Sequence, residues 1–142
     1  MKRLRWAVLL AAGIVAGAAC VADNREPWMT LEIDGHEYQG LLISYCWRSF
    51  AAGVCGDGII REPPMNVVRT ATPAVVHART RAGVRDLTLA VSPSLSALRP
   101  ARVDPTMAGP LVLEEGTHYV AVGAWWDRGD GLFLFGLRIE RP

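Results

Sequence analysis

The sequence predicts an all-β domain, built as a two-sheet sandwich, over residues 28–142. Short runs of β-branched, aromatic and aliphatic residues are separated by turns that contain glycine or proline. About seven such runs fit the strand number of a sandwich. The C-terminal runs alternate apolar and polar residues with the two-residue period of a strand. No run beyond the N-terminal segment has the apolar i, i+3, i+4 spacing of a helix.

Residues 1–19 have the three parts of an export signal peptide. Lys2, Arg3 and Arg5 form a positively charged start, Trp6–Ala16 is an apolar run, and small residues follow it. A transmembrane helix needs about 20 predominantly apolar residues, so this glycine-broken run is too short to span a bilayer comfortably. We therefore expect an exported protein from which the signal peptide is removed.

The motif Gly17-Ala18-Ala19-Cys20 resembles the lipobox of bacterial lipoproteins, although the family usually has an aliphatic residue where Gly17 stands. The resemblance implies that Cys20 is lipidated and becomes the mature N-terminus. Three cysteines leave one over when two of them pair, and a lipidated Cys20 accounts for it. The alternative is cleavage after Ala19 or Ala22 by ordinary signal peptidase, which gives a soluble periplasmic or secreted protein. We expect residues 20–27 to be a polar tether.

Turn signals define the strands of the first half of the domain. Asp34-Gly35 between two extended runs indicates a tight hairpin turn, because both central residues need a positive φ. The glycine-rich segment from Arg48 to Asn66 is expected to be irregular. The expected strands are Trp28–Ile33, His36–Gln39, Leu41–Trp47, Ala74–Thr80, Leu87–Val91 and Leu111–Leu113. The connection from Ser92 to Pro110 holds four prolines, which forbid a helix across most of it.

The C-terminal stretch predicts a long hairpin that reverses at Asp127–Gly131. Apolar residues at every second position give each strand one core-facing side. These residues are Val120, Val122, Ala124 and Trp126 before the turn, and Phe133, Phe135, Leu137 and Ile139 after it. Trp125 is then expected on the face opposite Trp126. Gly116-Thr117-His118-Tyr119 resembles the tyrosine corner of immunoglobulin-like domains, so we expect an immunoglobulin-like sandwich.

The charge balance argues against a nucleic-acid partner. Removal of the signal peptide takes away three basic residues and no acid, which changes the formal net charge of +1 by three units to −2. Binding of nucleic acid requires a clustered basic face, which this balance does not favour.

Cys46 and Cys55 are expected to form a disulfide, because pairing is the default in an oxidising compartment. A zinc site needs three or four ligands at compatible spacing, and the chain has no C-x-x-C, while its three histidines lie far apart. A disulfide would also leave neither Cys46 nor Cys55 available as a nucleophile. Neither G-x-S-x-G nor H-E-x-x-H occurs, so we expect no catalytic residue, metal or cofactor.

Five residues form the candidate binding surface. They are Trp47, Asp57, Trp125, Asp127 and Asp130. Each of the three aspartates is either a turn residue that accepts backbone hydrogen bonds or a ligand to a cation or polar molecule. Trp125 either stacks a sugar or a peptide aromatic or covers a sheet edge, and Trp47 either contributes to this surface or packs beside the disulfide.

The motifs "YCW", "VCGDG" and "YVAVGAWWDRGD", with the following "FLFGLRI", are similar to a family of small uncharacterised bacterial lipoproteins. The similarity extends from about Glu32 to Ile139 and is weak from Arg69 to Pro110. The matched positions are Tyr45, Cys46, Trp47, Cys55, Asp57, Trp126, Gly129 and Asp130. The resemblance implies an extracytoplasmic β-domain and brings no activity with it.

Together these observations predict an exported, lipid-anchored cell-envelope protein that acts as a binding or interaction module. Its partners are expected to be the membrane, through the lipidated N-terminus, and a small ligand or another envelope protein. The alternative is a structural envelope lipoprotein, or an accessory subunit that pairs through an exposed strand edge. An enzyme is not expected.

Overall fold

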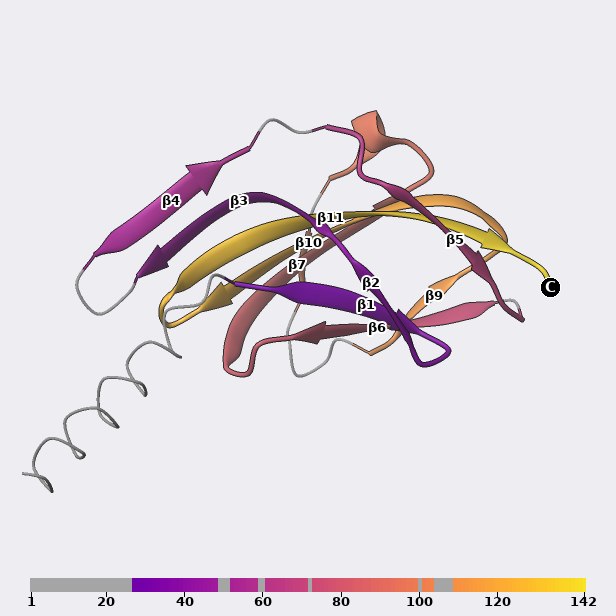
Figure 1. Ribbon diagram of the computed structural model, residues 1–142, viewed down its shortest axis with the longest axis horizontal. Helices are drawn as coiled ribbons and strands as arrows, with labels where there is room; N and C mark the ends of the chain where they lie inside the picture. The colour runs from indigo at the N-terminus through magenta and orange to yellow at the C-terminus, as the bar shows by residue number, and fades with distance from the viewer. Residues whose placement is uncertain (1–26, 49–51, 59–60, 72, 100, 104–108) are drawn as a thin grey trace, which may run out of the picture.

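The computed structural model describes residues 27–48, 52–58, 61–71, 73–99, 101–103 and 109–142. These residues form eleven strands and one short 3-10 helix, arranged as two sheets that pack face to face (Figure 1). The predicted all-β, two-sheet sandwich is confirmed, with eleven strands in place of about seven. The expected signal peptide, lipidated Cys20 and most of the tether lie outside the described residues.

The smaller sheet has four antiparallel strands in the order β2-β1-β6-β9. These are β1 (Met29–Ile33), β2 (His36–Gln39), β6 (Ala74–Thr80) and β9 (Leu111–Leu113). Three of them, β2, β6 and β9, have the predicted bounds. The β1–β2 hairpin turns through Asp34 and Gly35 at φ values of 50° and 76°, which confirms the prediction for this turn.

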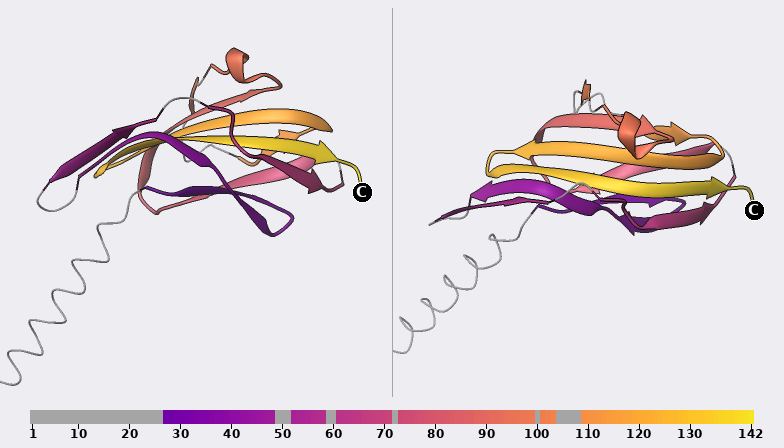
Figure 2. Two further views of the ribbon diagram at one scale, coloured as in Figure 1. Left: turned by 45° about the horizontal axis from the view of Figure 1, so that its top comes forward. Right: turned by 90° about the horizontal axis from the view of Figure 1, so that it is seen from above.

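The larger sheet follows the order β4-β3-β11-β10-β7-β8, and β5 also pairs with β11. Its strands are β3 (Leu41–Arg48), β4 (Gly53–Asp57), β5 (Met65–Arg69), β7 (Val84–Ser92), β8 (Ala101–Val103), β10 (Gly116–Trp126) and β11 (Gly129–Glu140). One edge of β11 pairs first with β3, antiparallel, and then with β5, parallel. Figure 2 shows the two layers from two further sides.

The prediction that Arg48 to Asn66 is irregular was wrong. The segment contains β4 and the start of β5. The sequence of β4 (GVCGD) gives no strand signal because it has no apolar alternation, and the strand lies largely exposed at the sheet edge. The connection after Ser92 contains the 3-10 helix η1 (Leu95–Ala97) and the short strand β8. A helix of three residues is compatible with the flanking prolines.

The main core lies between the sheets, and the predicted inward faces of β10 and β11 both contribute to it. Trp47 also belongs to this core, where its ring meets that of Trp126 edge-on with centroids 5.7 Å apart. The side chain is only 4% exposed, so the inclusion of Trp47 in the binding surface was wrong. The physical reason is strand alternation, which turns Trp47 inward while the neighbouring Cys46 faces out.

A second apolar cluster lies on the outer face of the larger sheet, away from the smaller sheet. Its buried members are Ile43, Ala90, Ala121 and Leu134, and the partly buried residues around them are Leu41, Leu95, Leu98 and Leu132. Figure 1 shows η1 on this side of the sheet, and Leu95 of η1 and Leu98 just after it cover part of the cluster. The outer face of the larger sheet, which the smaller sheet does not cover, therefore has a buried apolar cluster separate from the main core.

Candidate functional site

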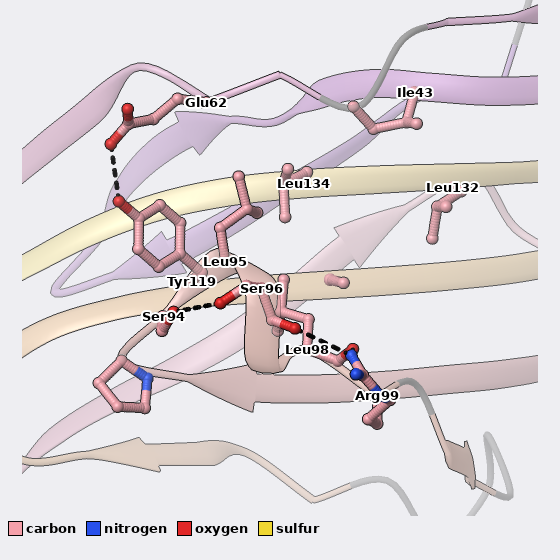
Figure 3. Close-up of a pocket in the computed structure, with 12 residues that line it drawn as sticks. Ile43, Glu62, Ser94, Leu95, Ser96, Leu98, Arg99, Tyr119, Leu132 and Leu134 are labelled. Carbon is pink, nitrogen blue, oxygen red and sulfur yellow. Dashed lines mark hydrogen bonds between the residues drawn. The ribbon is translucent and has the colours of Figure 1, made fainter.

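A pocket of about 750 Å³ opens on the outer face of the larger sheet, beneath the segment that contains η1 (Figure 3). Its floor consists of apolar side chains from β3, β10 and β11, namely Ile43, Ala121, Leu132 and Leu134. The segment from Pro93 to Arg99 forms the opposite wall.

Two local features leave room for this pocket. Ala121 contributes only a methyl group to the floor, whereas the other three floor residues have larger side chains. In β3, the register with β11 shifts between Leu132 and Phe133, so that Ile43 is an extra residue. Such a bulge re-aims side chains locally, and Ile43 joins the outer cluster.

Tyr119 and Glu62 form the polar end of the pocket. The Tyr119 hydroxyl donates a hydrogen bond to Oε1 of Glu62 over 2.8 Å, and this bond raises the pKa of Tyr119 above its ordinary value of 10.0. The expected tyrosine corner is therefore not made by this hydroxyl, which bonds to a distant side chain. Since Val120 faces the core, its neighbour Tyr119 faces the outer side of the sheet.

The other polar groups of the pocket belong to the segment around η1. The hydroxyl groups of Ser94 and Ser96 lie 2.9 Å apart, and Nη1 of Arg99 donates to the carbonyl oxygens of Ser96 and Leu98 at 3.0 and 2.7 Å. Figure 3 shows Arg99 on one side of the pocket and the Tyr119–Glu62 pair on the other. The arrangement suits a molecule with an apolar body that also carries a group able to hydrogen-bond.

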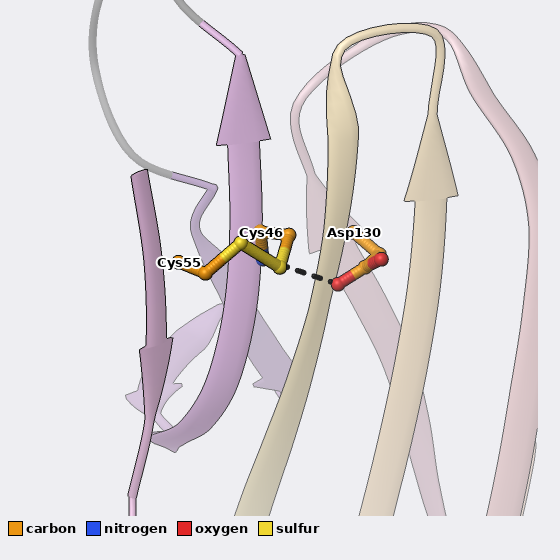
Figure 4. Close-up of a disulfide and its surroundings, with 3 residues drawn as sticks. All are labelled: Cys46, Cys55 and Asp130. Carbon is orange, nitrogen blue, oxygen red and sulfur yellow. Dashed lines mark hydrogen bonds between the residues drawn. A yellow bond between two sulfur atoms is a disulfide. The ribbon is translucent and has the colours of Figure 1, made fainter. Parts of the chain in front are cut away.

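The predicted disulfide between Cys46 and Cys55 is confirmed (Figure 4). The two residues are directly opposite each other on β3 and β4, with Cα atoms 4.0 Å apart. The bridge therefore fastens an edge strand to its only partner among the described strands. Asp57 lies at the end of the same edge strand and is exposed.

Asp127 and Asp130 lie at the turn between β10 and β11 and both have protein partners. Nη2 of Arg85 donates to Oδ2 of Asp127 over 2.7 Å, and this hydrogen bond lowers the pKa of Asp127 below its ordinary value of 3.8. Oδ1 of Asp130 accepts a hydrogen bond from the backbone N–H of Cys46 over 3.2 Å, as Figure 4 shows. Both carboxylates therefore accept hydrogen bonds from the protein at this turn.

Trp125 lies on the outer face, as predicted, and is 40% exposed. It is directly opposite Asp86 on β7 and Asp130 on β11. The structure thus brings Trp125 and Asp130 together. Asp57 is on β4, two strands away from β11, and Trp47 is in the core.

The pocket was not predicted from the sequence, although one signal for it was present. Leu132 and Leu134 occupy the positions of β11 that should be polar if its outer face met only water, and Ala121 does the same on β10. Apolar residues on both faces of a hairpin indicate that both faces are covered. In the part of the chain that the structure describes, no group of histidine, cysteine or acidic residues could hold a metal ion.

The chain matches no protein-family model, no curated protein and no solved structure. No helix among the described residues is long and apolar enough to cross a membrane.

Proposed function

We propose that the protein is a binding module of the cell envelope that holds a small, largely apolar ligand in the outer-face pocket. The observation that carries this proposal is the pocket of about 750 Å³ with its apolar floor. Ligand sites typically measure about 300–1,000 Å³ and combine apolar walls with a few polar groups. The Tyr119–Glu62 pair supplies such polar groups at one end.

A fluorescence titration with N-phenyl-1-naphthylamine, a neutral apolar probe, tests the pocket. The probe should brighten on binding to the protein, and Ala121→Phe should weaken binding by at least about tenfold because the added ring fills the floor. Val75→Phe is the matched control, since it adds the same ring at an exposed position of the smaller sheet. The proposal fails if the unaltered protein does not bind the probe, or if a folded Ala121→Phe variant binds it equally well.

The export signal and the lipobox-like motif support a location outside the cytoplasm, with a lipid anchor on Cys20. Without lipidation, the same domain would be a soluble periplasmic or secreted protein. The intact mass of the protein purified from membranes decides between them. A chain that begins at Cys20 and carries acyl mass supports the anchor, whereas an unmodified N-terminus rules it out.

A structural or accessory role is the second candidate, and one surface favours it. Val75 on β6 and Val112 on β9 are directly opposite each other, are 43% and 55% exposed, and lie beside the edge of the smaller sheet. An open edge with apolar neighbours can pair with another chain. Sedimentation of the purified protein tests self-pairing: a concentration-dependent dimer that Val112→Lys abolishes supports this role, and a monomer at all concentrations counts against it.

A further inference from the structure

We propose a second binding site, separate from the pocket, in which the indole ring of Trp125 stacks against one face of a pyranose sugar. The ring is at the other end of β10 from Tyr119, on the same outer face of the sheet. Tyr119 and Trp125 are six residues apart, which corresponds to about 20 Å along a strand. The two sites therefore do not overlap.

The ring lies along the sheet surface. A Cβ atom added to Gly123 would lie 3.2 and 3.3 Å from Cη2 and Cζ3 of Trp125, so the six-membered ring extends over this glycine. Gly123 is buried, whereas Trp125 is 40% exposed. The far edge of the indole thus lies over the backbone of Gly123, and part of the ring remains accessible to solvent. A sugar can stack on the accessible part of such an aromatic ring.

Acidic residues flank Trp125 in the sheet register. Asp86 and Asp130 are its directly opposite residues on the neighbouring strands, where Cβ atoms are about 5 Å apart. The backbone N–H of Cys46 holds Asp130 through Oδ1. Because an ionised carboxylate has acceptor sites on both oxygens, a carboxylate that accepts one such bond can also accept from a sugar hydroxyl.

The charges around the turn favour a neutral ligand over a cation. An aromatic ring flanked by carboxylates could attract a cation if negative charge were in excess. Arginines are at least as many as aspartates at this end of the domain. The aspartates are Asp86, Asp127 and Asp130, and the arginines are Arg48, Arg81, Arg85 and Arg128. Arg85 pairs with Asp127, and Arg48 donates to the backbone carbonyl of Asp127. A hydroxyl-rich, uncharged molecule fits this balance.

Titration with chitotriose, cellotriose and maltotriose, followed by NMR signals of the indole N–H groups, tests the site. At least one sugar should shift the Trp125 signal, with a Kd of about 1 mM. Trp125→Ala should weaken binding at least about tenfold, whereas Trp125→Tyr should retain part of it because an aromatic face remains. Trp28→Ala is the matched control, since Trp28 is another exposed tryptophan (47%) and lies just before β1 of the smaller sheet.

Asp130→Asn provides a second variant that leaves the ring in place. It should weaken sugar binding severalfold while an amide oxygen still accepts the Cys46 N–H bond. The proposal is overturned if none of the three sugars shifts the Trp125 signal at about 20 mM. It is also overturned if Trp125→Ala loses stability but keeps its affinity, because the ring would then serve only to cover Gly123. Ala121→Phe should leave sugar binding unchanged, so the pocket and this site can fail separately.

Discussion

Trp47 and Trp125 show how the same residue type takes opposite roles in this fold. Trp47 packs in the core against Trp126, and the guanidinium carbon of Arg81 lies 5.4 Å from the centroid of its ring. The Trp47 indole N–H is buried and has no hydrogen-bond partner among the described residues. Burial of such a donor costs about 1–3 kcal/mol. Burial of the large Trp47 ring therefore stabilises the fold, and the unpaired indole N–H cancels part of this stabilisation.

This balance predicts different effects for two substitutions at position 47. Trp47→Ala should reduce the free energy of unfolding by about 3–5 kcal/mol, because it leaves a large cavity. Trp47→Phe should cost clearly less, because it keeps an aromatic ring and removes the unpaired N–H. Urea denaturation measures both values, with Trp28→Ala as a control at an exposed tryptophan. Equal losses for the two variants would contradict the prediction.

The hydrogen bond to Glu62 makes the ionisation of Tyr119 dependent on folding. The bond raises the pKa of Tyr119 in the folded protein, so its contribution to stability is complete below the unfolded value near 10. That contribution is lost as the pH rises through the folded pKa. The tyrosinate absorbance, taken as a difference between the protein and Tyr119→Phe, should therefore show a midpoint above 10.0. Glu62→Ala should move the midpoint down, and an unchanged midpoint would mean that the bond is not made in solution.

At the scale of elements, the edge strand β4 depends on its disulfide. All of its residues except Gly56 are exposed, and its only partner among the described strands is β3. β3 itself also pairs with β11. We therefore expect β4 to open as a unit when the bridge is absent, while β3 stays in the sheet.

The double variant Cys46→Ser, Cys55→Ser tests this expectation. The bridge joins residues nine positions apart, and loss of a ring of this size should reduce stability by about 3 kcal/mol in the chain-entropy model. Amide hydrogen exchange should become fast in β4 and remain slow in β3. Equal acceleration in both strands would show that the bridge supports the whole sheet edge.

The strands themselves were predictable in proportion to how strongly they alternate. β6 and β9 have the bounds that pattern and turn signals indicate, and Asp34-Gly35 turns where expected. β4, β5 and β8 were missed, because these short strands of three to five residues lie in segments rich in glycine or proline and have no apolar alternation. The edge strands of the smaller sheet, β2 and β9, were predicted, whereas β4 and β8 at the edges of the larger sheet were not.

At the scale of the whole molecule, one core joins the two sheets. Leu31 of β1 and Leu137 of β11 belong to the same cluster, and both are almost fully buried. Because both sheets contribute to this cluster, separation of the sheets would expose it to water. The domain should therefore unfold in one cooperative transition.

Leu31→Ala and Leu137→Ala should each cost about 2–5 kcal/mol, and both should shift the entire transition. Circular dichroism, which follows all strands, and tryptophan fluorescence, which depends largely on the core, should give coincident urea curves. Val75→Ala, on the exposed face of the smaller sheet, should change the midpoint little. Separate transitions for the two probes in Leu31→Ala would show that the smaller sheet unfolds on its own.

The all-β class, the β1–β2 and β10–β11 hairpins, the inward faces of β10 and β11 and the disulfide could be predicted from the sequence, because each follows from local period, turn chemistry or cysteine pairing. That Trp47 is a core residue and that Tyr119 faces a pocket became clear from the tertiary structure. Tyr119 meets Glu62 from 57 positions away, beneath a segment that folds back over the sheet. Local periodicity states which residues share a face of a strand, but the path of the chain over that face depends on packing between distant segments.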